Sequence, residues 1–349
     1  MTIMYVGSIP KDIVTIVNYN CTFKDLEQVY IDDPIAALLV SKQKKPDVVF
    51  VDANMKLLNG YSFSAIISGY NDNGEIFLIT NKENKNTAGL SDVHIISFPY
   101  ILSEIVDKIQ AILEKHAAAQ QKSSFCWSSR IGSATDKVKK DQRNTLPAPI
   151  KSESGVNIDY IFSPYDELSG DCLDFWYSKK ENIIYGFLFD CTGHDIHSFT
   201  QVREMRTLFR LMFALRRDSL NKWLQNVNNE LFRLYADDTY CTAAVTFEIN
   251  LNTNLVRYCS AGIPYFWIKE NGEYEQVFME NFLIGCEPGC EFEESQVSIY
   301  PGKEVIFCSD GLSELLGKDL EKLKKPQQDD ISSVFISLDG GVQNEVYKN

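Results

Sequence analysis

A change in hydrophobic pattern near residue 145 divides this chain of 349 residues into two parts. Before it, short apolar segments typical of buried strands alternate with amphipathic segments typical of helices. The strands are expected at IMYV, DVVFVD, EIFLIT and HIISF, and the helices at KDIVTIVNY, PIAALLVSKQ and LSEIVDKIQAILEKH. This alternation predicts an α/β domain with a doubly wound parallel sheet over residues 1–115.

The rest of the chain is rich in strands. Residues 116–145 are poor in apolar side chains and predict a linker, partly helical at DKVKKDQRN. A second domain is expected over residues 146–342, with strands at NIIYGFLFD, TAAVTFEIN, LVRYCSA, YFWIKE and EVIFCS. Two helices interrupt them, around 201–216 and 219–235. The apolar residues of the first recur at helical spacing and predict a face buried in the core.

Composition narrows the class of protein. The net charge of -14 argues against a nucleic-acid surface, which needs a basic stripe. No apolar run approaches the ~20 residues of a membrane span, and the first residues do not form a signal peptide. The nine cysteines are scattered, and Cys286 and Cys290 lack the partners of a zinc site. We therefore expect reduced thiols in a cytoplasmic protein, with no nucleic-acid or membrane partner.

The second domain places acids at the ends of apolar strands. The stretch VIFCSDGLSELLG runs from a strand straight into Asp310, and Asp190 ends IIYGFLFD in the same way. Asp171 follows Ser-Gly, while Asp329 and Asp330 precede ISSVFISL. A single acid at a strand end is usually a turn former. Several such acids in one domain would repel one another unless cations neutralise them.

The residue types of this group favour a hard cation. Oxygen ligands without a cluster of histidine or cysteine suit Mg²⁺ or Mn²⁺ rather than zinc. Two such ions ~3.5–4 Å apart can bind a water, lower its pKa and clamp a phosphoryl group.

Five motifs in the second domain resemble a known family. Their order is similar to that of the SpoIIE/RsbU-like branch of the PPM metal-dependent serine/threonine phosphatases. The motifs are LPAPIKSESGVNIDYIFSPYDELSGDCLDFWY, LFDCTGHD, REMRTLFRLMF, SAGIPYFWI with FLIGCEPGCEFEESQVSIYPGKEVIFCSDGLSE, and DDISSVFISL. The resemblance covers about residues 146–340. It implies an α/β/β/α sandwich and two Mn²⁺ or Mg²⁺ ions.

The resemblance also implies roles for single residues. Asp190 would bridge both metals, with the carbonyl of Cys191 on one of them, and Asp310 and Asp329 would complete the other. Asp171 would bind directly or through water. Asp174 and Asp330 would support the ligands from behind, and His194 could give a proton to the leaving serine oxygen.

Three positions and the length of one segment depart from the family pattern. Asp195 replaces the second glycine of the Asp190 motif, Ser169 the first glycine of Gly-Gly-Asp, and Ile263 the histidine of Ala-Gly-His-Pro. Only 18 residues separate Asp310 from Asp329, where relatives carry a helix or two, so a shortened substrate-covering segment is expected.

The first domain resembles a response-regulator receiver. DVVFVDANMKLLNGYSF places Asp52 at the phosphoacceptor position, and Thr80 matches the switch Ser/Thr. The acid pair after the first strand is replaced by Gly7-Ser8, and the lysine of Thr-Lys-Pro-Phe by Phe98. Phosphorylation of an aspartate needs Mg²⁺ on those acids and a cation on the phosphoryl oxygens. We expect a receiver fold kept as an interaction module.

Two functions remain open on these residues. The first is a metal-dependent phosphatase that dephosphorylates a phosphoserine anti-sigma-factor antagonist of the STAS type in a bacterial stress or partner-switching pathway. An upstream regulator would bind the receiver-like domain, and a homodimer is an open possibility. The alternative is a non-enzymatic adaptor of the RssB kind that binds a sigma factor or another regulator. The retained acids favour the enzyme.

Overall fold

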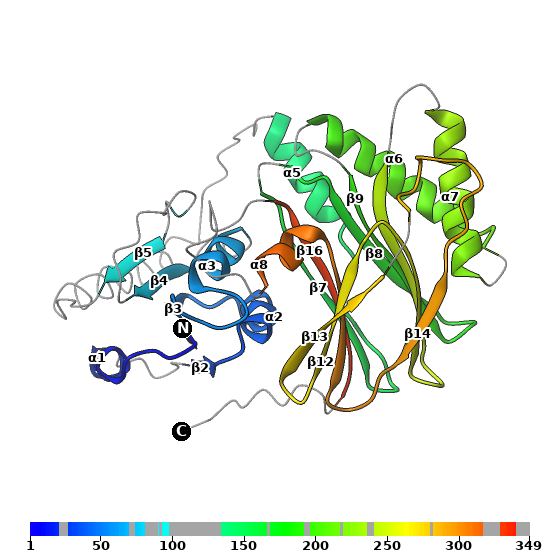
Figure 1. The fold of residues 1–349 in the computed structure, drawn as a ribbon. Coiled ribbons are helices and arrows are strands. Elements are labelled where there is room, and N and C mark those ends of the chain that lie inside the picture. Colours follow the sequence, from blue (N-terminus) through cyan, green and yellow to red (C-terminus); the bar gives the residue numbers. More distant parts are fainter. Residues whose placement is uncertain are drawn as a thin grey trace, which may run out of the picture. The chain divides into compact units, whose positions relative to one another are not determined.

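The chain forms two compact units (Figure 1), one built mainly from residues 1–133 and the other from residues 134–314 and 329–343. In this computed structural model the described residues are 1–20, 27–69, 74–80, 90, 93–97, 134–165, 168–191, 196–216, 219–235, 241–279, 282–316 and 329–339. The predicted helix LSEIVDKIQAILEKH, together with Phe98 and His194, lies outside them.

The first unit is a five-stranded parallel sheet in the order β2-β1-β3-β4-β5, which confirms the predicted sheet. This is the strand order of flavodoxin-like and receiver domains. The strands are β1 Thr2–Val6, β2 Glu27–Ile31, β3 Val48–Asp52, β4 Glu75–Thr80 and β5 Val93–Ser97. The described helices are α1 Lys11–Asn20, α2 Pro34–Lys44 and α3 Gly60–Ser68.

Two elements of this unit escape the sequence analysis. Val29 is the one fully buried residue of strand β2. The strand therefore lacks the apolar run that marks the other strands. Helix α3 begins inside the segment that resembles a phosphoacceptor loop. Its start is fixed by Asn59, whose side-chain oxygen accepts a hydrogen bond from the backbone N–H of Ser62 at 2.9 Å.

The second unit packs two antiparallel sheets face to face. One has the order β14-β11-β10-β9-β8, and the other has the order β13-β12-β15-β16-β7-β6. Their strands are β6 Ile150–Lys151, β7 Val156–Ser163, β8 Asp171–Ser178, β9 Ile183–Cys191, β10 Thr242–Asn250, β11 Leu255–Ala261, β12 Tyr265–Glu270, β13 Glu273–Phe278, β14 Glu294–Ser298, β15 Lys303–Cys308 and β16 Ile331–Leu338. Side chains such as Leu188, Phe247 and Phe307 fill the space between the sheets.

Two long helices cover the outer face of the β14–β8 sheet. They are α6 Ile196–Phe213 and α7 Leu220–Leu234, and Figure 1 shows them side by side. Val202, Met205 and Phe209 of α6 are buried against the sheet, as their spacing predicts. Helix α6 begins five residues earlier than the predicted 201–216.

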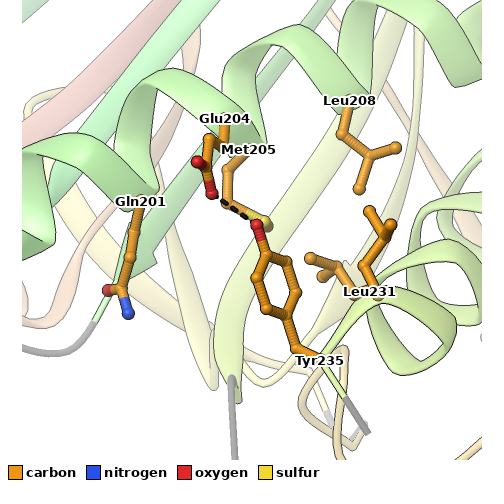
Figure 2. A pocket seen from close by; sticks show the side chains of 7 residues that line it. Gln201, Glu204, Met205, Leu208, Leu231 and Tyr235 are labelled. Carbon is orange, nitrogen blue, oxygen red and sulfur yellow. Dashed lines mark hydrogen bonds between the residues drawn. The ribbon is translucent and has the colours of Figure 1, made fainter. Parts of the chain in front are cut away.

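A small cavity of about 40 Å³ lies between these two helices (Figure 2). Met205 and Leu208 line it from α6, and Leu231 lines it from α7. At its edge the hydroxyl of Tyr235 donates a hydrogen bond to the carboxylate of Glu204. This volume is far below the roughly 300 Å³ at which ligand pockets begin, so the cavity is part of the packing between the helices.

Two shorter helices border the second unit's strands. Helix α5 Ala134–Asn144 lies in the expected linker, and by its contacts it groups with the second unit. Helix α8 Asp310–Leu315 follows β15. Within the described residues, α8 is the helical part of the short segment between Asp310 and Asp329.

One pair of cysteines corrects the expectation of reduced thiols. A disulfide joins Cys241 to Cys286, with the two Cα atoms 5.3 Å apart. Thr242 and Ile284 exchange two backbone hydrogen bonds, at 3.0 and 3.1 Å, and this brings the two cysteines together. The pairing escapes the sequence because the partners are 45 residues apart. None of the described helices is both long enough and apolar enough to span a bilayer.

Candidate metal centre

Strand pairing brings Asp171 and Asp190 together. Asp171 is the first residue of β8, Asp190 is the last but one of β9, and the antiparallel register sets them directly opposite each other. Directly opposed residues on one sheet have Cβ atoms within about 4.5–5.5 Å, so both carboxylates lie at one end of the sheet. The backbone N–H of Cys191 closes the pair by donating to the carbonyl of Gly170 at 3.0 Å.

The other sheet contributes its acids at the ends of β15 and β16. Cys308 of β15 pairs with Ser333 of β16, and the next residue, Ser309, donates its backbone N–H to the carbonyl of Ser332 at 2.8 Å. Asp310 therefore begins α8 beside the segment that leads into β16. Asp329 and Asp330 lie in that segment, so the predicted acids of both strands share one edge.

The glycine after Asp310 is required by close packing. A Cβ atom on Gly311 would lie 1.9 Å from the backbone oxygen of Asp330. The sequence does not predict this contact, because nothing near Gly311 indicates which backbone crosses it. The role of Gly311 is to let the Asp330 backbone approach the start of α8.

Asp330 supports the turn that carries Asp171. Its carboxylate accepts hydrogen bonds from the backbone N–H groups of Tyr165 and Gly170, each at 2.7 Å. Asp330 is only 3% exposed, so these bonds satisfy a carboxylate that water barely reaches. Asp330 thereby connects the edge of β16 to the start of β8.

Ser169 and Gln142 complete the same turn. The hydroxyl of Ser169 accepts a hydrogen bond from the backbone N–H of Asp171 at 3.0 Å, which a glycine at this position could not provide. The side-chain amide of Gln142, on α5, donates to the Ser169 carbonyl at 2.9 Å and accepts from its N–H at 3.3 Å. Gln142 was missed by sequence analysis because it is a single amide in a polar helix.

Burial and repulsion raise the pKa of Asp171 well above its usual range. Loss of solvation is the largest cause, followed by the charges of Asp190 and Asp330, while hydrogen bonds from Ser309 and Ser332 act in the opposite direction. The Oδ2 atom of Asp171 is buried and has no hydrogen-bond partner among the described residues. A nearby cation would satisfy this oxygen and offset the repulsion.

The pKa of Asp310 is raised for similar reasons. Partial loss of solvation is again the largest cause, although Asp310 keeps an exposed surface, and the charges of Asp329 and Glu314 follow. A hydrogen bond with the Asp190 carboxyl lowers the pKa by a smaller amount, so Asp190 interacts with both Asp171 and Asp310. Glu314 was not predicted as a site residue, although it is the glutamate of the Asp-Gly-x-x-Glu run and stands one helical turn after Asp310.

These acids fit a divalent cation by chemistry and charge. They are oxygen donors at one edge of the sheets, where Asp171 is buried with an unpartnered Oδ2, Asp190 is half-buried and Asp310 is exposed. Within the part of the chain that the structure describes, no three or more His, Cys, Asp or Glu side chains converge in the geometry of a complete metal site. The acidic side chains therefore lie at one edge of the two sheets, but they do not surround a common position as the ligands of a complete metal site do.

Asp174 faces away from this group. It is on β8, three residues after Asp171, so its side chain leaves the opposite face of the sheet. There its carboxylate accepts hydrogen bonds from the guanidinium groups of Arg206 at 2.8 Å and Arg210 at 2.8 and 2.9 Å. In this structure Asp174 fastens α6 to the sheet and does not contact the other acids.

In the first unit, Asp52 ends β3 as predicted. Its carboxylate accepts hydrogen bonds from the N–H groups of Asn54 at 2.8 Å and Ser8 at 3.3 Å. A Cβ atom on Gly7 would lie 2.8 Å from Cγ of Met55, so the methionine side chain fills the space beside Asp52 where an acid on β1 would extend. Thr80, at the end of β4, is buried.

The comparisons with known proteins give one family match. Residues 184–337 match the model of the family described as Stage II sporulation protein E (SpoIIE). No curated protein matches this sequence.

Solved structures of phosphatases are similar to part of this chain. The SiaA-PP2C domain of Pseudomonas aeruginosa is 16% identical with a TM-score of 0.48, covering 64% of this chain and 100% of that one. RsbX in complex with magnesium is 13% identical with a TM-score of 0.42, covering 55% and 98%. The PP2C phosphatase domain of SpoIIE from Bacillus subtilis, with a fragment of its regulatory domain, is 15% identical with a TM-score of 0.44, covering 52% and 63%.

The family match spans β10, β15 and most of β9 and β16. It therefore includes Asp190 near the end of β9 and Asp310 just after β15. Residues 184–337 of this chain thus match the SpoIIE family.

Proposed function

We propose that the second unit hydrolyses phosphoserine or phosphothreonine in a protein substrate, using two Mg²⁺ or Mn²⁺ ions. The observation that carries the proposal is the group of carboxylates at one edge of the sheets. Loss of solvation and the charge of Asp190 raise the pKa of Asp171, and loss of solvation and the charge of Asp329 raise the pKa of Asp310. Such a group is costly in a domain that has no use for a cation.

Particular residues would hold the ions. Asp190, which interacts with both Asp171 and Asp310, is suited to contact both ions, with the Cys191 carbonyl beside it. Asp310 and Asp329 would complete one site, and Asp171 would face the other. When bound, the two ions would activate a water and neutralise the phosphoryl oxygens. Asp330 and Ser169 keep the Asp171 turn in place through their backbone hydrogen bonds.

Other roles follow from the family resemblance. His194 would donate a proton to the leaving serine oxygen. The motif order supports a phosphorylated STAS-type anti-sigma antagonist as the substrate, in a partner-switching pathway. We propose the receiver-like unit as the surface on which an upstream protein or a second copy of the chain acts.

Mn²⁺-dependent hydrolysis of p-nitrophenyl phosphate and of a phosphoserine protein tests the proposal. Asp190→Asn and Asp310→Asn remove a charge from the group with little change in volume, so turnover should fall by about 10²-fold or more while the fold is kept. Glu275→Gln, an exposed acid on β13, is the matched control and should keep full activity.

Near-normal turnover of Asp310→Asn at saturating Mn²⁺ would overturn its assignment. A wild-type chain that binds no Mn²⁺ and hydrolyses neither substrate would favour the non-enzymatic adaptor. The shortened segment between Asp310 and Asp329 is the feature that keeps this second function worth testing.

A further inference from the structure

A cavity of about 330 Å³ lies between α5 and α6, on the outer side of the β8–β9 sheet. It falls within the size range of small-molecule sites, roughly 300–1,000 Å³. None of the acids of the candidate metal centre lines it. The residues that matter here are Gln142 and Thr145 at the end of α5 and Phe199, Val202, Arg203 and Arg206 on α6.

The cavity has a cationic wall. Arg203 and Arg206 are three residues apart on α6, so both guanidinium groups lie on one face of the helix. Within the described residues Arg203 makes no ion pair, and it is largely exposed. Arg206 shares the carboxylate of Asp174 with Arg210, so two cations are balanced there by one anion. One further acid, Asp141, reaches the cavity from α5.

Arg206 has hydrogen-bonding capacity to spare. Its Nη2 donates to the carbonyl of Thr145 at 3.3 Å and to Asp174 at 2.8 Å. Its Nε–H is buried and has no hydrogen-bond partner among the described residues. Buried donors of this kind are rare in proteins and mark places where a partner belongs.

The floor of the cavity is apolar. Phe199 and Val202 are 7% and 5% exposed, and the guanidinium carbon of Arg203 stands 6.0 Å from the centre of the Phe199 ring. A ligand with an anionic head and an apolar body would therefore meet the arginines with the head and these two side chains with the body.

We propose that this cavity binds a small organic anion, with a phosphate or carboxylate group between Arg203 and Arg206. Such groups form charge-assisted hydrogen bonds with guanidinium, often in pairs. In a chain of net charge -14, a local excess of positive charge on a concave wall is a feature that selects for anions. The anion could be a free metabolite or a phosphorylated side chain of a protein.

Gln142 connects the cavity to the Asp171 turn. Its side chain lines the cavity and forms two hydrogen bonds with the backbone of Ser169, two residues before Asp171. An anion that holds α5 against α6 would fix Gln142, and thereby restrict the backbone of Gly170 and Asp171. Binding here is therefore expected to stabilise the turn that carries one of the proposed metal ligands.

Calorimetric titration of the metal-free full chain with phenyl phosphate tests the binding. Removing metal with a chelator keeps phosphate away from the candidate metal centre. We expect saturable binding that is tighter than that of inorganic phosphate, because the phenyl ring meets Phe199 and Val202. Arg203→Gln should weaken it about tenfold, as loss of one charge-assisted bond implies. The control Arg233→Gln, on the exposed face of α7, should bind like wild type.

A phosphoserine peptide, titrated in the same way, distinguishes the two sources. Tighter binding than phenyl phosphate, lost in Arg203→Gln, would identify a protein segment as the ligand, and weaker binding would identify a metabolite. No binding at millimolar concentrations, or equal binding by wild type and Arg203→Gln, would overturn the site.

Hydrogen exchange tests the connection to the turn. The amides of Gly170 and Asp171 should exchange more slowly when phenyl phosphate is bound to the metal-free chain. Gln142→Ala, compared with wild type at equal ligand occupancy, should remove this difference. Unchanged exchange at full occupancy would overturn the coupling.

Discussion

The fold places the Asp171 carboxyl where its ionised form is unfavourable. It is 2% exposed, stands opposite Asp190 and has an Oδ2 atom without a hydrogen-bond partner among the described residues. Its raised pKa means that the folded chain prefers this carboxyl protonated, whereas the unfolded chain ionises it near pH 3.9. Ionising Asp171 therefore destabilises the metal-free fold.

The pH dependence of stability follows from this sign. Below the unfolded pKa the carboxyl is neutral in both states, and the penalty is absent. As the pH rises toward the folded pKa the unfolded state loses its proton first, so stability falls. We expect metal-free Asp171→Asn to melt above wild type near neutral pH and to converge with it near pH 4. Calorimetry at both pH values checks this, and a lower Tm for the variant near pH 7 would contradict it.

Gly311 is a second test at the residue scale. Gly311→Ala would place Cβ 1.9 Å from the Asp330 backbone oxygen, and backbone cannot move aside as a flexible side chain can. We expect a loss of at least roughly 1–3 kcal/mol of unfolding free energy, together with weaker Mn²⁺ binding because Asp310 would shift. Chemical denaturation and Mn²⁺ titration measure the two effects.

Gly302→Ala is the control for this substitution. Gly302 has a positive φ of 94° but no atom within 4 Å of its Cβ position. It should lose only about 1–2 kcal/mol through backbone strain and leave Mn²⁺ binding unchanged. Equal Mn²⁺ affinity in Gly311→Ala and wild type would show that Asp310 does not depend on this contact.

At the scale of elements, the position of α6 depends on a charge pair across the sheet face. Asp174 on β8 binds Arg206 and Arg210, and the Arg210 guanidinium also stacks 3.6 Å from the centre of the Trp176 ring. Beside these groups, Trp223 of α7 donates its indole N–H to the carbonyl of Phe209 at 2.8 Å. Polar contacts thus fix the register of the two helices on an apolar sheet.

Asp174→Asn should destabilise the second unit by roughly 2–3 kcal/mol. It leaves two guanidinium groups without their carboxylate, and the usual cost of 3–5 kcal/mol is reduced because they are 31% and 36% exposed. Thermal unfolding measures the loss. Glu230→Gln, which breaks the exposed pair with Arg233 on α7, should leave Tm unchanged. A Tm for Asp174→Asn equal to that of wild type would contradict the role of the pair.

At the scale of the whole molecule, the chain joins a unit with a five-stranded parallel sheet to a second unit that contains the match to the SpoIIE family. Asp52 uses its carboxylate to accept two backbone hydrogen bonds, and Met55 fills the space beside Gly7. The carboxylates that would hold Mg²⁺ are replaced by Gly7 and Ser8. Regulation through this unit is therefore expected to depend on a bound protein.

Acetyl phosphate or beryllofluoride should leave phosphatase activity and oligomeric state unchanged. Asp52→Ala should cost only the local hydrogen bonds of its turn. Asp33→Ala, which removes the N-terminal cap of α2, is the comparison and should cost about 1 kcal/mol. Mass spectrometry and activity assays give the answer. Stoichiometric phosphate on Asp52 together with altered activity would restore an ordinary two-component function.

The sequence by itself determined the features that depend on local pattern. The apolar strands β1, β3, β4, β9, β10 and β15 were predicted because a buried strand needs a run of apolar residues wherever it ends up. The parallel sheet followed from their alternation with helices. The acids at strand ends were visible for the same reason, since each follows or precedes such a run.

Only the tertiary structure decided which of those acids meet. The register of β8 on β9 sets Asp171 against Asp190, and the face alternation of β8 turns Asp174 toward Arg206 and Arg210. The contacts of Gln142 with Ser169, of Gly311 with Asp330, and of Cys241 with Cys286 join residues distant in sequence. No local pattern encodes such contacts, because they depend on which backbones the packing of two sheets brings together.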